Sequence, residues 1–214
     1  MTTGPDVSSA KEDFEIGAGD LALEFANTSD WHAGPAPVEF LNSYEDLAAW
    51  SRRCGVIDEA DRKGLVIQAK RRPGEARAAL RRAISLREAI YRTFSAVAHK
   101  KQPRNQDMTE LNLALAESLA RLRVMPEGKR FSWEWSGGLT LDRMIGPVAQ
   151  AAASLLTSPE LSRVGECADD RGCGWLFVDR SKNHSRRWCD MKGCGNRAKA
   201  NRYQVRARAG VRLG

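Results

Sequence analysis

Four cysteines near the C-terminal end of the sequence limit what this chain can fold into more than any other feature. They form two close pairs with the spacing C-x5-C-x15-C-x4-C: Cys167, Cys173, Cys189 and Cys194. A tetrahedral zinc site with four thiolate ligands has this arrangement, because each pair supplies two sulfurs from one turn. The glycine after Cys173 and the one after Cys194 let the backbone turn beneath a bound sulfur. We therefore predict one structural zinc ion held by these four cysteines.

The cysteine spacing is also compatible with two disulfides, an iron–sulfur cluster, or four unrelated buried thiols. Disulfides form in oxidising compartments, and the first thirteen residues lack the apolar core of a secretory signal. This absence favours reduced thiols and predicts a cytoplasmic protein. The fifth cysteine, Cys54, stands alone, and we expect it to be a small buried apolar residue.

Positive charge is concentrated in the cysteine-rich segment. Residues 160–214 contain thirteen Lys and Arg against six Asp and Glu, whereas residues 1–159 contain twenty-one of each. Four thiolates around one zinc ion contribute about −2, so roughly +5 remains for an acidic partner. The sequence after Cys194 is rich in helix formers, and the spacing of Lys199, Arg202 and Arg206 places them on one helix face.

A basic helix anchored by a zinc-binding turn suits the backbone or a groove of a nucleic acid. The predicted contacts are six basic side chains: Arg186, Arg187, Arg197, Lys199, Arg202 and Arg206. We expect phosphate contacts to dominate and DNA to be favoured over RNA. Arg197 has a second interpretation, because it follows the second cysteine pair directly and could bind Asp190 or the thiolates. A basic helix that binds nothing in particular is the remaining alternative.

The sequence around the last two cysteines resembles a known family. Trp188-Cys189 and, above all, Cys194-Gly195-Asn196-Arg197 are similar to the bacterial CGNR zinc finger. In that family the finger follows an N-terminal ABATE domain, and the run LALEFANT at 21–28 resembles the start of that domain. The first cysteine pair is one residue wider here than is usual in the family. The resemblance implies a stress-induced transcription regulator with zinc in its C-terminal finger.

The apolar pattern predicts a mainly helical protein with minor β structure, in the α+β class. Apolar residues recur at helical spacing from about residue 75 to 100. Shorter helices are expected to start at Ser43, Asp58, Asp107 and Thr140, and the one from Asp107 extends through Leu122. Alternation over 131–135 predicts a half-buried strand, and residues 175–178 predict a short strand beside the metal.

These patterns divide the chain into three parts. We predict a disordered N-terminus over 1–13, a helical ABATE-like domain over 14–158, and a CGNR-type zinc-finger module over 159–214 that ends in the basic helix. No apolar run approaches the roughly eighteen residues that cross a bilayer, so no membrane association is expected.

The sequence gives little sign of catalysis. Four cysteine ligands close a zinc tetrahedron, which is the arrangement of structural sites, and we expect no enzymatic activity. One polar cluster beside an aromatic ring, made of Asn27, Thr28, Trp31 and His32, could hold a small-molecule effector. The same cluster could instead cap a helix and pack its tryptophan.

We predict a DNA-binding transcription regulator whose N-terminal domain senses an effector or forms a homodimer. One alternative is an RNA-binding or ribosome-associated protein, because zinc-ribbon-like modules with basic helices bind either polymer. The other is an adaptor whose basic surface meets an acidic protein.

Overall fold

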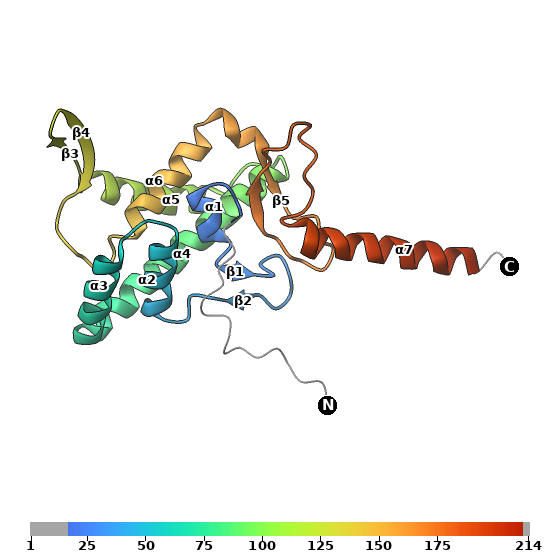
Figure 1. Ribbon diagram of the computed structural model, residues 1–214, viewed down its shortest axis with the longest axis horizontal. Helices are drawn as coiled ribbons and strands as arrows, with labels where there is room; N and C mark the ends of the chain where they lie inside the picture. Colours follow the sequence, from blue (N-terminus) through green and yellow to red (C-terminus); the bar gives the residue numbers. More distant parts are fainter. Residues whose placement is uncertain (1–16, 212–214) are drawn as a thin grey trace.

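The computed structural model describes the backbone of residues 17–211, and side chains as far as Gln204 except that of Arg202. Segment 1–13, predicted to be disordered, lies outside the described residues. Figure 1 shows an elongated molecule made mainly of helices, with a short hairpin at one end and a long helix at the other. The predicted fold class, mainly α with minor β, is confirmed.

Seven α-helices lie in the described range: α1 (Leu21–Ala26), α2 (Tyr44–Arg53), α3 (Glu59–Arg71), α4 (Pro73–Ala98), α5 (Asn105–Leu119), α6 (Ile145–Leu156) and α7 (Asn196–Val211). Three antiparallel strand pairs accompany them: β1 (Ser29–Asp30) with β2 (Val38–Glu39), β3 (Leu122–Glu127) with β4 (Arg130–Trp135), and β5 (Val164–Glu166) with β6 (Leu176–Val178). A 3-10 helix at Pro159–Arg163 precedes β5, and a π-helical turn at Met191–Gly195 precedes α7. None of the described helices has the length and apolarity needed to span a membrane.

Helix α4 forms the centre of the fold, and the five other helices among α1–α6 pack around it (Figure 1). Its inner face carries alanines in the first half, Ala76, Ala79 and Ala83, and larger residues such as Ile90 and Phe94 in the second half. Small side chains let neighbouring helices approach closely, because the distance between helix axes depends on the residues at the contact. Because α4 spans Pro73–Ala98, the long helix predicted over about 75–100 is confirmed.

Local sequence signals explain how several helices begin. Ser43 and Asp46 form a reciprocal capping box at the start of α2, and Asp58 accepts a hydrogen bond from the backbone N–H of Asp61 at the start of α3. Pro73 occupies the first turn of α4, where its missing N–H has no helical partner to lose. The predicted starts at Ser43 and Asp58 are confirmed.

The predicted cap at Asp107 is wrong. Helix α5 begins two residues earlier, and Asp107 is a buried carboxylate that binds Arg92 at 2.7 Å and Arg104 at 2.9 Å. Burial alone raises the pKa of Asp107, but hydrogen bonds from the two guanidinium groups outweigh burial and hold the pKa below its usual range. The predicted cap at Thr140 is also wrong, because α6 begins at Ile145.

The segment after α5 differs from the predicted helix. Helix α5 ends at Leu119, and the residues from Leu122 onward form β3, which pairs with β4 through a turn at Gly128. The strand predicted at 131–135 is confirmed as β4, but it is not half-buried along its length. Phe131 is 75% exposed and Trp133 is 66% exposed.

Candidate metal centre

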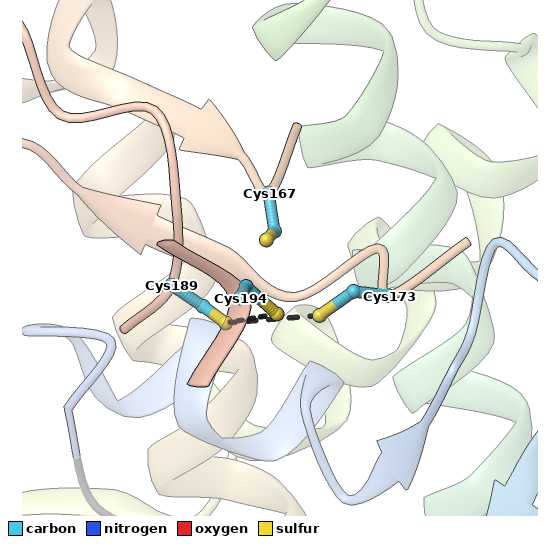
Figure 2. A group of neighbouring side chains, drawn as sticks. All are labelled: Cys167, Cys173, Cys189 and Cys194. Carbon is cyan, nitrogen blue, oxygen red and sulfur yellow. Dashed lines mark hydrogen bonds between the residues drawn. The ribbon is translucent and has the colours of Figure 1, made fainter. Parts of the chain in front are cut away.

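The four cysteines of the two predicted pairs converge on one point (Figure 2). Their sulfurs all lie within 4.8 Å of one another, with 3.7 Å between Cys173 and Cys189 and 3.5 Å between Cys189 and Cys194. Tetrahedral Zn–S bonds of about 2.3 Å place sulfurs about 3.8 Å apart, so these separations fit one zinc ion. All five cysteines are free thiols, so the cysteines do not form the two disulfides that the spacing also allowed.

Each cysteine pair is positioned by a different piece of local structure. Cys167 follows β5, and its backbone N–H donates to the carbonyl of Trp175 at 2.8 Å, so the strand pair closes the loop that carries Cys173. Cys189 and Cys194 bracket the start of the π-helical turn at the base of α7. The two halves are joined where the N–H of Ala168 donates to the carbonyl of Arg187. The wider first pair is thus accommodated in the β5–β6 connection.

Glycines shape the loop of the first pair. Gly172 has a φ of 93° and Gly174 has a φ of 69°, a region that L side chains rarely adopt. A Cβ on Gly172 would lie 2.5 Å from the Cα of Gly34, so the loop also touches the N-terminal domain. The prediction of a turning glycine is confirmed at Gly174. Gly195 is a looser case, because a Cβ there would lie 2.9 Å from the sulfur of Met191, whose exposed side chain can move away.

Without a cation the four sulfurs cannot all carry negative charge. Hydrogen bonds from the neighbouring thiols lower the pKa of Cys167, while the contact with Cys167 raises the pKa of Cys173 and of Cys189. Burial raises the pKa of Cys194. A bound Zn²⁺ removes this conflict, because its charge stabilises all four thiolates. The chemistry of the donor set therefore fits a structural zinc ion, which holds the two cysteine pairs together.

Arg197 is placed directly on the metal centre. Its Nη2 donates to the sulfur of Cys194 at 2.8 Å, and its Nε donates to the carboxylate of buried Asp169 at 3.3 Å. A charge-assisted hydrogen bond to a ligand sulfur stabilises the thiolate form and orients it. Asp190, the other predicted partner of Arg197, instead accepts a hydrogen bond from the backbone N–H of Gly193.

The other predicted contact residues have different surroundings. The guanidinium of Arg186 donates to the carbonyls of Trp188 and Cys189 and lies 4.3 Å from the ring centre of Phe177, so it supports the second cysteine pair. Arg187 and Lys199 are exposed. Arg202 and Arg206 belong to α7, but their side chains lie outside the described residues.

Two members of the predicted effector cluster make hydrogen bonds within the protein. The side-chain amide of buried Asn27 donates to the carbonyl of Leu176 and accepts from its N–H, both at 2.9 Å. The hydroxyl of Thr28 donates to the carbonyl of Phe25 at 2.7 Å. Asn27 therefore joins the end of α1 to β6, two elements far apart in sequence.

The other two members of that cluster also lie where the N-terminal domain meets the cysteine module. His32 stacks on Tyr91 with 3.6 Å between ring centres, and its backbone N–H donates to the carbonyl of Cys173. Trp31 packs against the cysteines, and the guanidinium of Arg197 lies 5.4 Å from its ring centre. The structure thus brings the cluster and the metal centre together, although they are more than 130 residues apart in the sequence.

A cavity of about 220 Å³ lies elsewhere, between α4, α5, α6 and the base of the β3–β4 hairpin. Its apolar lining includes Leu86, Leu113 and Ile145, and the indole of Trp135 forms part of the wall. This cavity was not predicted, because it depends on how the unpredicted hairpin packs onto the helices.

Comparison with known families agrees with this architecture. The ABATE family model, described as "Putative stress-induced transcription regulator", matches residues 19–159, about two thirds of the chain. The chain belongs to the ABATE family. The model of the CGNR zinc finger matches residues 163–207 of this ABATE protein and so encloses all four cysteines. A search of curated proteins gave no match.

Proposed function

We propose that this ABATE-family protein is a DNA-binding transcription regulator, without enzymatic activity, that contacts DNA through α7. The observation that carries the proposal is the form of this helix. Figure 1 shows α7 extending away from the helical body, and no acidic residue follows Asp190 in the sequence. Residues 196–211 carry five Lys and Arg and no Asp or Glu, so α7 has a strongly positive field.

Packing against the rest of the protein contributes little to the stability of α7. Its described side chains, from Asn196 to Gln204, are exposed apart from the half-buried Ala198 and the undescribed Arg202. Sixteen residues form a helix about 24 Å long, only slightly longer than the roughly 12–15 residues below which isolated helices are marginal in water. A DNA major groove, about 12 Å wide, admits such a helix and neutralises its charge. Partner binding would therefore supply the stabilisation that packing does not.

The metal centre sets the direction of α7. Cys194 lies in the turn that leads directly into the helix, and Arg197 in the first helical turn binds both the sulfur of Cys194 and Asp169. Asn201, one turn further, donates to the carboxylate of Asp170 at 3.1 Å. Zinc in this proposal holds the base of a DNA-contacting helix in a fixed orientation.

Salt dependence of binding tests the proposal. The zinc-loaded full chain is titrated onto labelled duplex DNA and duplex RNA, and anisotropy is recorded over a series of salt concentrations. With about five phosphate contacts, log affinity should fall against log salt with a slope of roughly −4 to −5 on DNA. Replacing Lys199, Arg202 and Arg206 together by alanine should flatten that slope to about −2.

A matched control removes the same charge elsewhere. Lys70, Arg77 and Arg81 are exposed on α3 and α4, and their triple alanine variant should keep the wild-type slope. Both variants should retain one zinc ion per chain. An equal slope in wild type and the α7 variant would contradict the assignment, and preference for RNA in competition would favour an RNA-binding protein instead.

A further inference from the structure

The β3–β4 hairpin has one apolar face and one polar face. Residues directly opposite each other in an antiparallel pair point to the same side of the sheet. The apolar face contains the pairs Leu122–Trp135, Val124–Trp133 and Pro126–Phe131. The polar face contains the pairs Arg123–Glu134, Met125–Ser132 and Glu127–Arg130.

Only the base of the apolar face is covered by the rest of the described protein. Leu122 is buried, and the indole of Trp135 packs so closely on α6 that a Cβ on Gly146 would lie 2.6 Å from it. Further out, Val124 is 55% exposed, and Phe131 and Trp133 are more exposed still. Figure 1 shows the hairpin projecting from the body. The largest contiguous apolar patch on a monomeric protein is often a functional surface, and the exposed side chains of Val124, Phe131 and Trp133 adjoin one another.

The two edges of the hairpin are not equivalent. The N–H of Ser136 donates to the carbonyl of Arg121 at 2.7 Å, and hydrogen-bonded pairs alternate with non-bonded pairs along an antiparallel ladder. Phe131 and Trp133 therefore direct their N–H and C=O groups away from β3. The corresponding position on the outer edge of β3 is Pro126, which has no N–H to donate. Strand β4 is the edge that can accept another strand.

We propose that two copies of this chain form a dimer by pairing their β4 strands antiparallel, with the two-fold axis at Ser132. Phe131 then lies opposite the partner's Trp133 on the apolar face. On the polar face, Arg130 lies opposite the partner's Glu134, and symmetry repeats each pair. The strand is thus complementary to itself in both charge and apolar pattern.

Neighbouring registers lose this complementarity. A shift by one residue places apolar side chains opposite polar ones, which is the usual penalty of register slippage. Moving the axis to Trp133 places Arg130 opposite the partner's Ser136 and removes the charge pair. The register centred on Ser132 keeps both the aromatic pair and the charge pair.

The exposed aromatic area on β4 places the proposed dimer contact among small interfaces. At 75% and 66% exposure, Phe131 and Trp133 offer about 300 Å² per copy, or about 600 Å² in the dimer, from side chains of roughly 200–250 Å² each. This area is below the roughly 1,200 Å² of a standard stable interface. An interface of this size is weak and transient, so the dimer should form reversibly and dissociate on dilution.

Sedimentation equilibrium of the zinc-loaded full chain, without nucleic acid, tests the proposal independently of the proposed function. Glu134→Arg and Arg130→Glu should each weaken dimerisation about tenfold, because each places like charges opposite one another twice per dimer. The double variant R130E/E134R should recover dimerisation. Within one hairpin Glu134 faces Arg123 and Arg130 faces Glu127. If the two charges acted only within one hairpin, each substitution would place like charges opposite one another there. The double variant would then dimerise less than either single variant.

A cysteine at the symmetry axis gives a second readout. Ser132→Cys should yield a disulfide-linked dimer under mild oxidation, since position 132 faces itself across the axis at a non-hydrogen-bonded pair. The control Lys129→Cys should not, because its two copies would lie about 20 Å apart. Monomers at all concentrations, or a dimer that responds to none of these changes, would overturn the proposal.

Discussion

Replacing Asn27 by alanine tests how strongly the N-terminal domain holds the metal centre. The Asn27 amide exchanges two hydrogen bonds of 2.9 Å with the backbone of Leu176, in a buried position. Asn27→Ala leaves one N–H and one C=O of β6 without their partner. Each unsatisfied buried group costs about 1–3 kcal/mol, so the variant should lose about 2–6 kcal/mol of unfolding free energy. That loss is a large part of the roughly 5–15 kcal/mol typical of folded domains.

Denaturant unfolding of the zinc-loaded protein measures this loss, and competition with a chromophoric chelator measures zinc affinity. Because β6 follows the loop that carries Cys173, zinc affinity should also fall. Each 1.4 kcal/mol by which the substitution destabilises the zinc-bound protein more than the zinc-free protein should lower zinc affinity about tenfold. The control is Asn42→Ala, which removes one exposed hydrogen bond to the carbonyl of Glu39 and should change stability by no more than about 0.5 kcal/mol. A loss at Asn27 no larger than that at Asn42 would refute the reasoning.

Four further outcomes are expected. Removing zinc with a strong chelator should cost on the order of 10 kcal/mol or more and unfold the module, which near-ultraviolet circular dichroism would detect through Trp175 and Trp188. Gly172→Ala should weaken zinc binding, whereas Gly55→Ala should leave it nearly unchanged. Both glycines have positive φ, but only a Cβ on Gly172 would clash with backbone, at 2.5 Å from the Cα of Gly34. Arg197→Ala should lower zinc affinity about 10–100-fold, with Arg197→Lys intermediate, in the same chelator assay. Asp107→Asn should destabilise the protein by about 2 kcal/mol near neutral pH. Because the folded-state pKa of Asp107 is lowered, that difference should shrink as the pH falls below about 4, and a pH-independent difference would contradict the assignment.

The metal site could be predicted because its information is local. Each cysteine pair is separated by only a few residues, so the spacing alone limits where the sulfurs can meet. The capping box at Ser43 is local for the same reason, since its two partners are three residues apart. Signals of this kind do not depend on how distant parts of the chain pack.

Features that depend on distant partners could not be predicted. Asn27 and Leu176 are 149 residues apart, so the sequence showed a polar cluster but not its hydrogen bonds to β6. Arg87 is buried because Glu39, far along the chain, binds it with two hydrogen bonds of 2.6 Å. The sequence around Asp107 is compatible with a helix cap and with a buried carboxylate. The ion pairs with Arg92 and Arg104 show that it is a buried carboxylate.

The hairpin shows a limit of periodicity over short segments. Leu111, Leu115, Leu119 and Leu122 continue a helical pattern, yet the last of them begins β3. A single residue satisfies both the helical and the strand period, so the pattern alone does not locate the end of the helix. The cross-strand aromatic side chains of β4 decide the outcome, because they pair with β3.

The hairpin and α7 lie at opposite ends of the long axis of the molecule (Figure 1). Antiparallel pairing of two β4 strands places the two bodies at opposite ends of the joint sheet, and each α7 lies at the end of its own body away from the hairpin. Repressors that read a palindrome need their two recognition helices about 34 Å apart on one face of the duplex. If α7 contacts DNA as proposed, a dimer joined at Ser132 would carry its two DNA-contacting helices on separate bodies. It would then tether two separate stretches of DNA, as a looping or bridging protein does.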